Sequence, residues 1–388
     1  MLFLQFLLTL PLRNTISEQF MSSMPIKDIA LSFVPGLGTR GAAHLLECFG
    51  SAEAIYAASA RELISRAELR EDVARAIVAG AGIKEAEREA KHCHKHGIEV
   101  ISSRDEAYPS LLREIDDYPP VIYLRGNRSA LTRRTVAFVG TRKISSYGQR
   151  MCNELVQGLA EAVPDAVVIS GLAYGVDSAC HRAALQYGLA TVGVVANSLP
   201  DVTPAAHRQL AEEMIARGGA IVTELPSQTK QNGRFFIPRN RIIAAMAAGT
   251  VVVESAESGG SLSTAAFADG YNRTVMALPG RATDVSSRGC NILIRNRKAQ
   301  AILSGEDIAR ELMWDMALDG IRTPAKEPVP LTHDEERLIA LFDNEPIGID
   351  TLLMRSGLSA GELSLHLMTL ELSGAIRQLP GKQYEKLI

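Results

Sequence analysis

The sequence predicts an α/β protein with a Rossmann-like parallel sheet at its centre, a helical domain before the sheet and a winged helix after it. Between residues 136 and 278, short Val/Ile-rich runs with little apolar–polar alternation recur between helical stretches. This pattern is typical of parallel strands that helices cover on both faces. The 388 residues are also too many for one ordinary core, and the 31 glycines suit many tight strand–helix turns.

Residues 1–24 are expected to be a dispensable leader or the product of a mis-assigned start. The apolar run 1–12 has no basic residue before it and no small-residue cleavage site after it. It is also shorter than the roughly 20 residues that span a bilayer. The 5 cysteines are scattered without CxxC spacing, which favours neither disulfides nor a zinc site. We therefore expect a cytoplasmic protein without membrane contact, metal or cofactor.

Residues 25–97 are predicted to form a helical domain that resembles SAM or helix–hairpin–helix units. A helix over 28–34 is followed by the turn Pro35–Gly36–Leu37–Gly38, and the helical period resumes over 42–49. A Gly-x-Gly turn of this kind lets a backbone approach a phosphate, but a tight helical turn needs the glycines in any case. The structural role is the simpler interpretation. His92 and His96 share a helix face, but no second cluster supports a metal site, so a solvated helix end is favoured.

Residues 98–312 are predicted to form the Rossmann-like domain. A strand at 98–101 precedes the central strands, which are expected at 136–139, 166–169, 190–195, 220–223, 251–254 and 275–278. Residues 130–312 carry 19 Lys/Arg against 15 Asp/Glu, a balance of +4, whereas residues 1–129 have −2 and residues 331–388 have −4. A polyanion is therefore expected to bind the middle of the chain.

A linker at 313–330 and a winged helix at 331–388 are predicted to complete the chain. Thr332 caps a helix through Phe342, two helices follow at 349–356 and 359–372, and a hairpin ends the sequence. Helix–helix–helix–ribbon is the order of a winged helix. The last of these helices has no Lys or Arg, which opposes sequence-specific DNA reading and favours contact with a protein or a role in dimerisation.

The first motif of the middle domain is Gly140–Thr141–Arg142, directly after its first strand, with Ser145 opening the next helix. A glycine lets the chain turn at the strand end, and hydroxyl and backbone donors then stand at a helix N-terminus, where anions are favoured. The planar, forked charge of Arg142 suits a phosphate. These four residues are candidate phosphate ligands.

The second motif contains Ser170, Gly171 and Gly175, followed by Asp177 and His181. It also joins a strand to a helix, so its first three residues are candidate phosphate ligands. The spacing is not GxGxxG, and no GxxxxGK[ST] occurs in the chain, which argues against ATP hydrolysis. Asp177 and His181 are four residues apart, and we expect a supporting structural pair rather than an acid–base pair.

The third motif combines aromatic and basic residues with a second Ser/Gly turn. Its candidate DNA-binding residues are Phe235, Phe236, Arg239, Asn240, Arg241, Ser258, Gly259, Gly260, Ser261 and Thr264. Arginines beside aromatic rings suit single strands, because charge follows the backbone while a ring stacks on a base. In an extended loop the two phenylalanines would point apart, one into the core and one toward DNA. Glu254 is expected to hold Arg239 or Arg241 in place.

Together these strings resemble the DNA-processing protein A (DprA/Smf) family over nearly the whole chain. Further matching stretches are 108–126, Pro279–Gly280 and 289–294. The resemblance implies a protein that binds single-stranded DNA, forms a homodimer through the Rossmann-like domain and loads a RecA-type recombinase during natural transformation. It also implies that Gly140–Arg142 grip phosphate and that Arg239–Arg241 lie beside the groove. Cys180, Thr203–Pro204 and residues 295–298 depart from the family pattern, away from the phosphate-gripping residues.

An enzymatic alternative is a nucleoside monophosphate phosphoribohydrolase on the same core. Those enzymes use a glycine-rich loop that contains a glutamate, whereas residues 258–268 contain no carboxylate. This alternative depends on fold analogy alone. The sequence therefore favours a DNA-binding protein that is not an enzyme.

Overall fold

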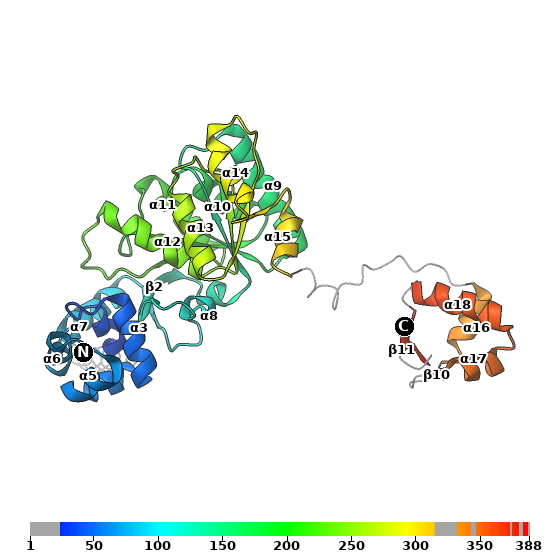
Figure 1. The fold of residues 1–388 in the computed structure, drawn as a ribbon, viewed down its shortest axis with the longest axis horizontal. Coiled ribbons are helices and arrows are strands. Elements are labelled where there is room, and N and C mark those ends of the chain that lie inside the picture. The colour runs from blue at the N-terminus through cyan, green and yellow to red at the C-terminus, as the bar shows by residue number, and fades with distance from the viewer. Residues whose placement is uncertain (1–23, 315–331, 343–346, 373–374, 380–382, 387–388) are drawn as a thin grey trace, which may run out of the picture. The chain divides into compact units, whose positions relative to one another are not determined.

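The computed structural model describes residues 24–314, 332–342, 347–372, 375–379 and 383–386. The chain divides between Asp315 and Met316 into two compact units, so the helical N-terminal region and the large sheet belong to one unit (Figure 1). The second unit contains the C-terminal helices and a small sheet. The expected leader, apart from Met24, and most of the expected linker lie outside the described residues.

Short helices form the N-terminal part of the first unit. They are α2 Ile26–Leu31, α3 Gly38–Phe49, α4 Ala52–Ala57, α5 Ala60–Ala67, α6 Glu71–Val78 and α7 Ile83–Lys95. The turn before α3 needs its glycines, because Gly36 and Gly38 have φ of +76° and +67°. Tyr118, which precedes the second strand, donates a hydrogen bond of 3.3 Å to the Ala43 carbonyl of α3. The helices and the sheet region are therefore packed against each other.

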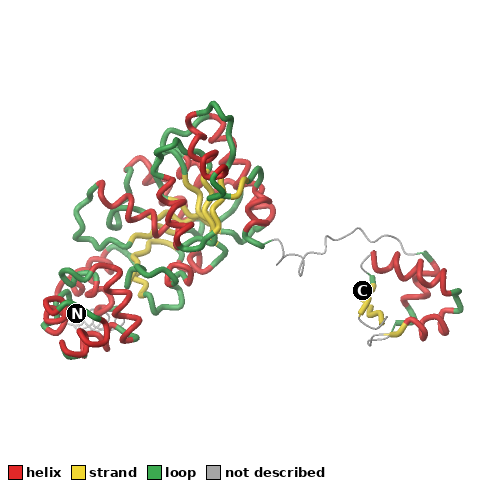
Figure 2. Tube along the Cα trace, in the orientation of Figure 1, coloured by secondary structure: helices red, strands yellow, loops and turns green. Residues whose placement is uncertain are grey.

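The large sheet has nine strands in the order β1-β2-β6-β5-β4-β3-β7-β8-β9. Its strands are the yellow segments among the red helices of the first unit in Figure 2. Their bounds are β1 Glu99–Ser102, β2 Val121–Gly126, β3 Thr135–Val139, β4 Val167–Ser170, β5 Ala190–Val194, β6 Ala220–Thr223, β7 Gly249–Val252, β8 Thr274–Ala277 and β9 Gln300–Ala301. In this order, every neighbouring pair between β6 at one side and β9 at the other is parallel. The sequence predicts this parallel pairing for the central strands. The sequence pattern does not predict β2, which joins antiparallel β1 to β6, or the two-residue β9.

Helices cover both faces of this sheet. The helices of the first unit that follow β1 are α8 Ser110–Arg113, α9 Ser146–Ala162, α10 Val176–Gln186, α11 Arg208–Ala216, α12 Phe236–Ala245, α13 Ser261–Gly270, α14 Arg288–Arg295 and α15 Gly305–Glu311. Val136 and Phe138 of β3 pack with α9, α10 and α15, whereas Ala137 and Val139 pack with α12 and α13. This alternation along one strand places the strand ends, and the loops that follow them, between two helical layers.

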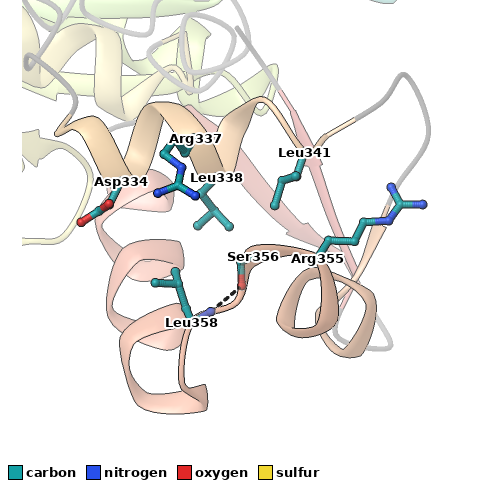
Figure 3. A pocket seen from close by; sticks show the side chains of 7 residues that line it. All are labelled: Asp334, Arg337, Leu338, Leu341, Arg355, Ser356 and Leu358. Atoms are coloured by element: carbon teal, nitrogen blue, oxygen red, sulfur yellow. Dashed lines mark hydrogen bonds between the residues drawn. The ribbon is translucent and has the colours of Figure 1, made fainter.

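The second unit has the predicted order of helices and hairpin. Its elements are α16 His333–Ile339, β10 Ile347–Gly348, α17 Ile349–Ser356, α18 Ala360–Leu372, β11 Ile376–Leu379 and β12 Gln383–Lys386. Helix α16 ends three residues before Phe342, whose side chain joins the small core of the unit. The hollow in Figure 3, lined by Leu338, Leu341 and Leu358 among others, holds about 70 Å³. It is too small for a nucleotide, because ligand pockets occupy roughly 300–1,000 Å³.

Candidate functional site

A cleft of about 330 Å³ opens at the carboxyl ends of β3 and β7. From β3 the chain proceeds outward through β4, β5 and β6 on one side of the sheet. It then returns to the centre, where β7 pairs with β3, and proceeds outward through β8 and β9 on the other side. The sheet order therefore reverses between β3 and β7. Open α/β sheets bind their ligands at such a switch point, outside the carboxyl ends of the strands.

All three sequence motifs contribute to the lining of this cleft. The candidate residues that line it are Gly140, Thr141, Arg142, Asp177, Phe236, Arg239, Asn240, Gly259, Gly260, Ser261 and Thr264. The candidates that do not line it are Ser145, Ser170, Gly171, Gly175, His181, Phe235, Arg241, Glu254 and Ser258. Motifs that are far apart in the chain thus contribute to one cleft, and the remaining candidates lie outside its lining.

Hydrogen bonds to Glu254 fix the loop that follows β3. This buried carboxylate accepts hydrogen bonds from the backbone N–H of Ser145, at 2.9 Å, and from its hydroxyl, at 2.5 Å. The Ser145 oxygen also accepts a bond from the N–H of Gly148 at 3.0 Å. Ser145 therefore caps α9 and uses its donors inside the protein. The sequence predicts that Ser145 donates hydrogen bonds to a phosphate and that Glu254 pairs with Arg239 or Arg241. In the structure the two residues bind each other instead.

The glycines of the second motif bring two loops together. Gly175 has a φ of +79°, and a Cβ there would lie 2.2 Å from the carbonyl oxygen of Thr141. A Cβ at Gly171 would lie 2.4 Å from the Arg239 guanidinium. The Ser170 hydroxyl donates to the carbonyl of Phe138 at 2.6 Å. These three residues shape the floor behind the cleft, and a side chain at either glycine would displace its contacts.

Arg239 is the buried cation of the site. Its side chain donates to the carbonyl of Gly171 at 2.7 Å and to that of Val194, and it lies beside the carboxylate of Asp177. Burial lowers the pKa of Arg239 to about 10, so the guanidinium stays charged at neutral pH. Burial also raises the pKa of Asp177, against the lowering effect of Arg239. The Asp177 carboxylate accepts the N–H of Ala173 at 3.2 Å and so helps to hold the loop at the edge of the cleft.

His181 is buried beneath the second motif and does not pair with Asp177. Its Nδ1 lies 2.6 Å from the Thr191 hydroxyl oxygen, and this hydroxyl donates its hydrogen to the carbonyl of Val168. Nδ1 therefore donates to Thr191. Burial, with smaller contributions from His207 and Arg239, lowers the pKa of His181 to about 3. His181 is consequently a neutral structural group, and the expected contact with Asp177 is wrong.

Arg142 and Phe236 form the exposed part of the site. The Arg142 guanidinium lies 5.0 Å from the centre of the Phe236 ring, and that of Arg239 lies 6.0 Å from it. Arg142 is exposed and has no carboxylate partner among the described residues. The ring is half-buried, at the first residue of α12. A free guanidinium and an accessible ring therefore stand together above the buried charge of Arg239.

The expectation that one of the two phenylalanines is a core residue of an extended loop is wrong. Residues 233–235 form a short 3-10 helix that continues directly into α12, so the segment is not extended. Both rings are half-buried, and neither joins a hydrophobic core cluster. Phe236 lines the cleft, whereas Phe235 lines a second cavity beside it.

Arg241 is also outside the cleft. It is only 6% exposed and forms ion pairs with Glu224 and, at 3.4 Å, with Asp117. It donates a further hydrogen bond of 2.7 Å to the Asp117 carbonyl. The structure thus assigns Arg241 to the packing of α12 rather than to phosphate contact. Asn240 connects α12 to α13 through a hydrogen bond of 3.0 Å to the Ser263 hydroxyl.

Five further residues line the cleft, and none has a chemical group that would mark it in the sequence: Val139, Ala173, Ile237, Ile243 and Ala256. Ile237 is 63% exposed. Its exposure depends on the direction of α12, which the sequence pattern around Pro238 does not indicate.

No group of three or more metal-ligating side chains occurs within the described parts of the chain. The rings of His92 and His96 are tilted against each other by 37°, with 4.4 Å between their centres. Across the same described residues, no helix combines the length and the apolarity that crossing a membrane requires.

The fold and the cleft define a Rossmann-like protein with a winged helix, whose cleft is lined by two arginines and an aromatic ring. The chain belongs to the DNA recombination-mediator protein A family, whose sequence model matches residues 99–313. The model of the DprA winged helix domain matches residues 322–382. These matches confirm the resemblance, the Rossmann-like core and the winged helix that the sequence predicts.

Individual relatives agree with this assignment. The chain is 33% identical to Protein Smf of Escherichia coli over 73% of its own length and 76% of the relative. It is 31% identical to a putative DNA processing protein DprA of Mycobacterium tuberculosis, over 86% and 87% of the two chains. The solved structure of DNA processing protein A from Streptococcus pneumoniae superposes with a TM-score of 0.60 at 29% identity, covering 74% of this chain and 98% of that one.

Proposed function

We propose that this protein binds single-stranded DNA in the cleft between β3 and β7 and presents it to a RecA-type recombinase. The observation that carries the proposal is the position of the exposed Arg142 over the accessible ring of Phe236, at the switch point of the sheet, with no carboxylate partner for Arg142 among the described residues. A phosphate can take the free guanidinium while the neighbouring base stacks on the ring. This combination suits an unpaired strand, because the bases of a duplex are stacked on one another.

A solved relative supports the same ligand. A structure from Helicobacter pylori, described as giving the single-stranded DNA binding mode of its DNA processing protein A, matches with a TM-score of 0.50 at 25% identity. That match covers 57% of this chain and 97% of the other. Loading of a recombinase, a homodimer through the Rossmann-like domain and a place in the cytoplasm extend the proposal through the family resemblance. The cleft itself argues only for the DNA.

The carboxylates near the cleft favour binding over hydrolysis. Glu254 accepts two hydrogen bonds from Ser145, and Asp177 accepts the N–H of Ala173 beside Arg239. Each carboxylate is thus engaged in holding a loop. We propose a mediator rather than a phosphoribohydrolase, and release of base from nucleoside monophosphates by the purified protein would contradict this.

Single-stranded DNA should bind more tightly than a duplex of the same sequence, because only unpaired bases can stack on Phe236. The logarithm of the binding constant should fall linearly with the logarithm of salt concentration, by about 0.7 for each phosphate neutralised on a single strand. Fluorescence anisotropy with a labelled oligothymidine and a labelled duplex, across a salt series, measures both quantities. Equal or tighter binding of the duplex would overturn the proposed function.

Replacing Arg142 should weaken binding of all single-stranded sequences alike, since phosphate contacts position a strand without reading it. We expect Arg142→Ala to lose about tenfold in affinity, which equals roughly 1.4 kcal/mol. Arg142→Lys should recover only part of this, because it keeps the charge but not the planar fork. The exposed Arg182 of α10, outside the cleft, provides the matched control Arg182→Ala. Equal affinities for the Arg142 and Arg182 variants would exclude Arg142 as a phosphate ligand.

A further inference from the structure

A second cavity, of about 660 Å³, lies beside the cleft, between the N-terminal helices and the segment that connects β6 to α12. One wall contains Phe33 and the first turn of α3, with Thr39 at its edge. The opposite wall contains Leu225, Pro226 and Phe235. This cavity thus combines apolar walls with polar groups at its rim, which is the usual composition of a site for a flat organic ligand.

Phe235 in this cavity repeats the arrangement of Phe236 in the cleft. The guanidinium of Arg234 lies 5.0 Å from the centre of the Phe235 ring, the same separation as that between Arg142 and Phe236. Arg234 is exposed, lines the cavity and has no carboxylate partner among the described residues. Each of two adjacent rings therefore has its own free arginine, and each pair faces a different hollow.

The two hollows use different residues of the same segment, at the start of α12. Phe236 and Ile237 line the cleft, whereas Phe235 lines the second cavity and Pro238 faces it as well.

Near the first turn of α12, Lys230 and Arg234 are exposed, whereas Arg239 and Arg241 are buried. Glu224 also lines the second cavity, but its carboxylate is paired with Arg241. A strand that leaves the cleft over the first turn of α12 would therefore meet apolar surface and two exposed cations, and Arg241 already compensates the charge of Glu224.

We propose that the second cavity is a further subsite for single-stranded DNA, in which a base stacks on Phe235 and a phosphate contacts Arg234. The proposal rests on the proposed function, because the strand would reach the subsite from the cleft. The position of the cavity next to the cleft-lining residues Phe236 and Ile237, together with the exposed cations Lys230 and Arg234, favours nucleic acid over a cationic or purely apolar partner surface. The strand would thus span both sides of α12 and touch the N-terminal helices at Thr39.

The test measures affinity for oligothymidines of increasing length by anisotropy, with the full-length protein. For short oligomers that fill only the cleft, Phe235→Ala and Arg234→Gln should have the same affinity as the unchanged protein. Beyond a threshold length, the affinity of the unchanged protein should rise. At these lengths both variants should bind about fivefold or more weakly than the unchanged protein, as expected for the loss of one stacked base. Arg142→Ala should lose affinity at every length.

Thr39→Glu keeps the test independent of folding. An acidic residue in the first turn of a helix is favoured by the helix dipole, so α3 should not be destabilised. The new charge should nevertheless repel the strand and weaken binding of the longer oligomers only. Lys84→Gln in the first turn of α7, with the same change of net charge outside the cavity, is the matched control and should leave affinity unchanged.

The outcomes separate this inference from the proposed function. If Arg142→Ala weakens binding but Phe235→Ala, Arg234→Gln and Thr39→Glu bind all lengths normally, the second subsite is refuted and the first cleft stands. If Arg142→Ala also binds normally, the proposed function fails first. If the three variants of the second cavity bind DNA normally but no longer load the recombinase, the cavity binds a protein and the inference is overturned.

Discussion

Arg241→Ala should lower the free energy of unfolding by about 3–5 kcal/mol while leaving the DNA cleft intact. Its guanidinium joins Glu224 and Asp117, and the side chain of Glu224 is only 13% exposed. Removing one partner of a buried ion pair leaves the other charge desolvated and uncompensated, which costs roughly this amount. Burial already raises the pKa of Glu224, and Arg241 is the main influence that opposes this rise.

Urea unfolding followed by circular dichroism measures the loss, and anisotropy of the folded variant measures DNA affinity. Arg310→Ala is the control, because its pair with Asp307 leaves the Arg310 side chain 64% exposed and should be worth less than about 1 kcal/mol. A folded Arg241→Ala protein of normal stability that has lost DNA affinity would contradict the position of Arg241 in the structure.

The position of the site could be predicted from the sequence because it depends on topology. Gly140–Arg142 and residues 258–261 each follow a Val-rich strand, and parallel strands bring their carboxyl ends to one edge of the sheet. Apolar runs without alternation likewise indicate strands that are covered on both faces. Segments more than 100 residues apart could thus be assigned to one site before any contact was known.

The partners of individual side chains could not be predicted in the same way. Arg239 and Arg241 are the same residue type in the same motif, so the sequence does not distinguish their roles. On a helix, however, residues i and i+2 point in different directions. The structure places the first at the cleft and the second against Glu224 and Asp117. Pro238 hides the helical pattern of this segment, so the sequence favours an extended loop there. The contact between Ser145 and Glu254 depends on the close pairing of β3 with β7, which no local pattern specifies.

His181 should make the protein less stable as the pH falls from 6.5 toward 3. The folded protein keeps this histidine neutral because its pKa is lowered to about 3, whereas the unfolded chain takes up a proton near the ordinary value of about 6.5. The unfolded state therefore binds more protons within this window, and the free energy of unfolding rises with pH. The contribution is fully present above 6.5, and about 2 kcal/mol of it should be lost at pH 5.

Urea unfolding of the unchanged protein and of His181→Gln, between pH 7 and pH 5, tests this expectation. The variant should be less stable at pH 7, because it loses the contact with Thr191, but its stability should fall less steeply on acidification. Burial raises the pKa of Asp177 and Glu224, and these groups act in the opposite direction. They are present in both proteins, so the difference between the two slopes isolates His181. Parallel slopes would show that His181 already takes up its proton in the folded protein, and the neutral, structural role of this residue beneath the cleft would then be wrong.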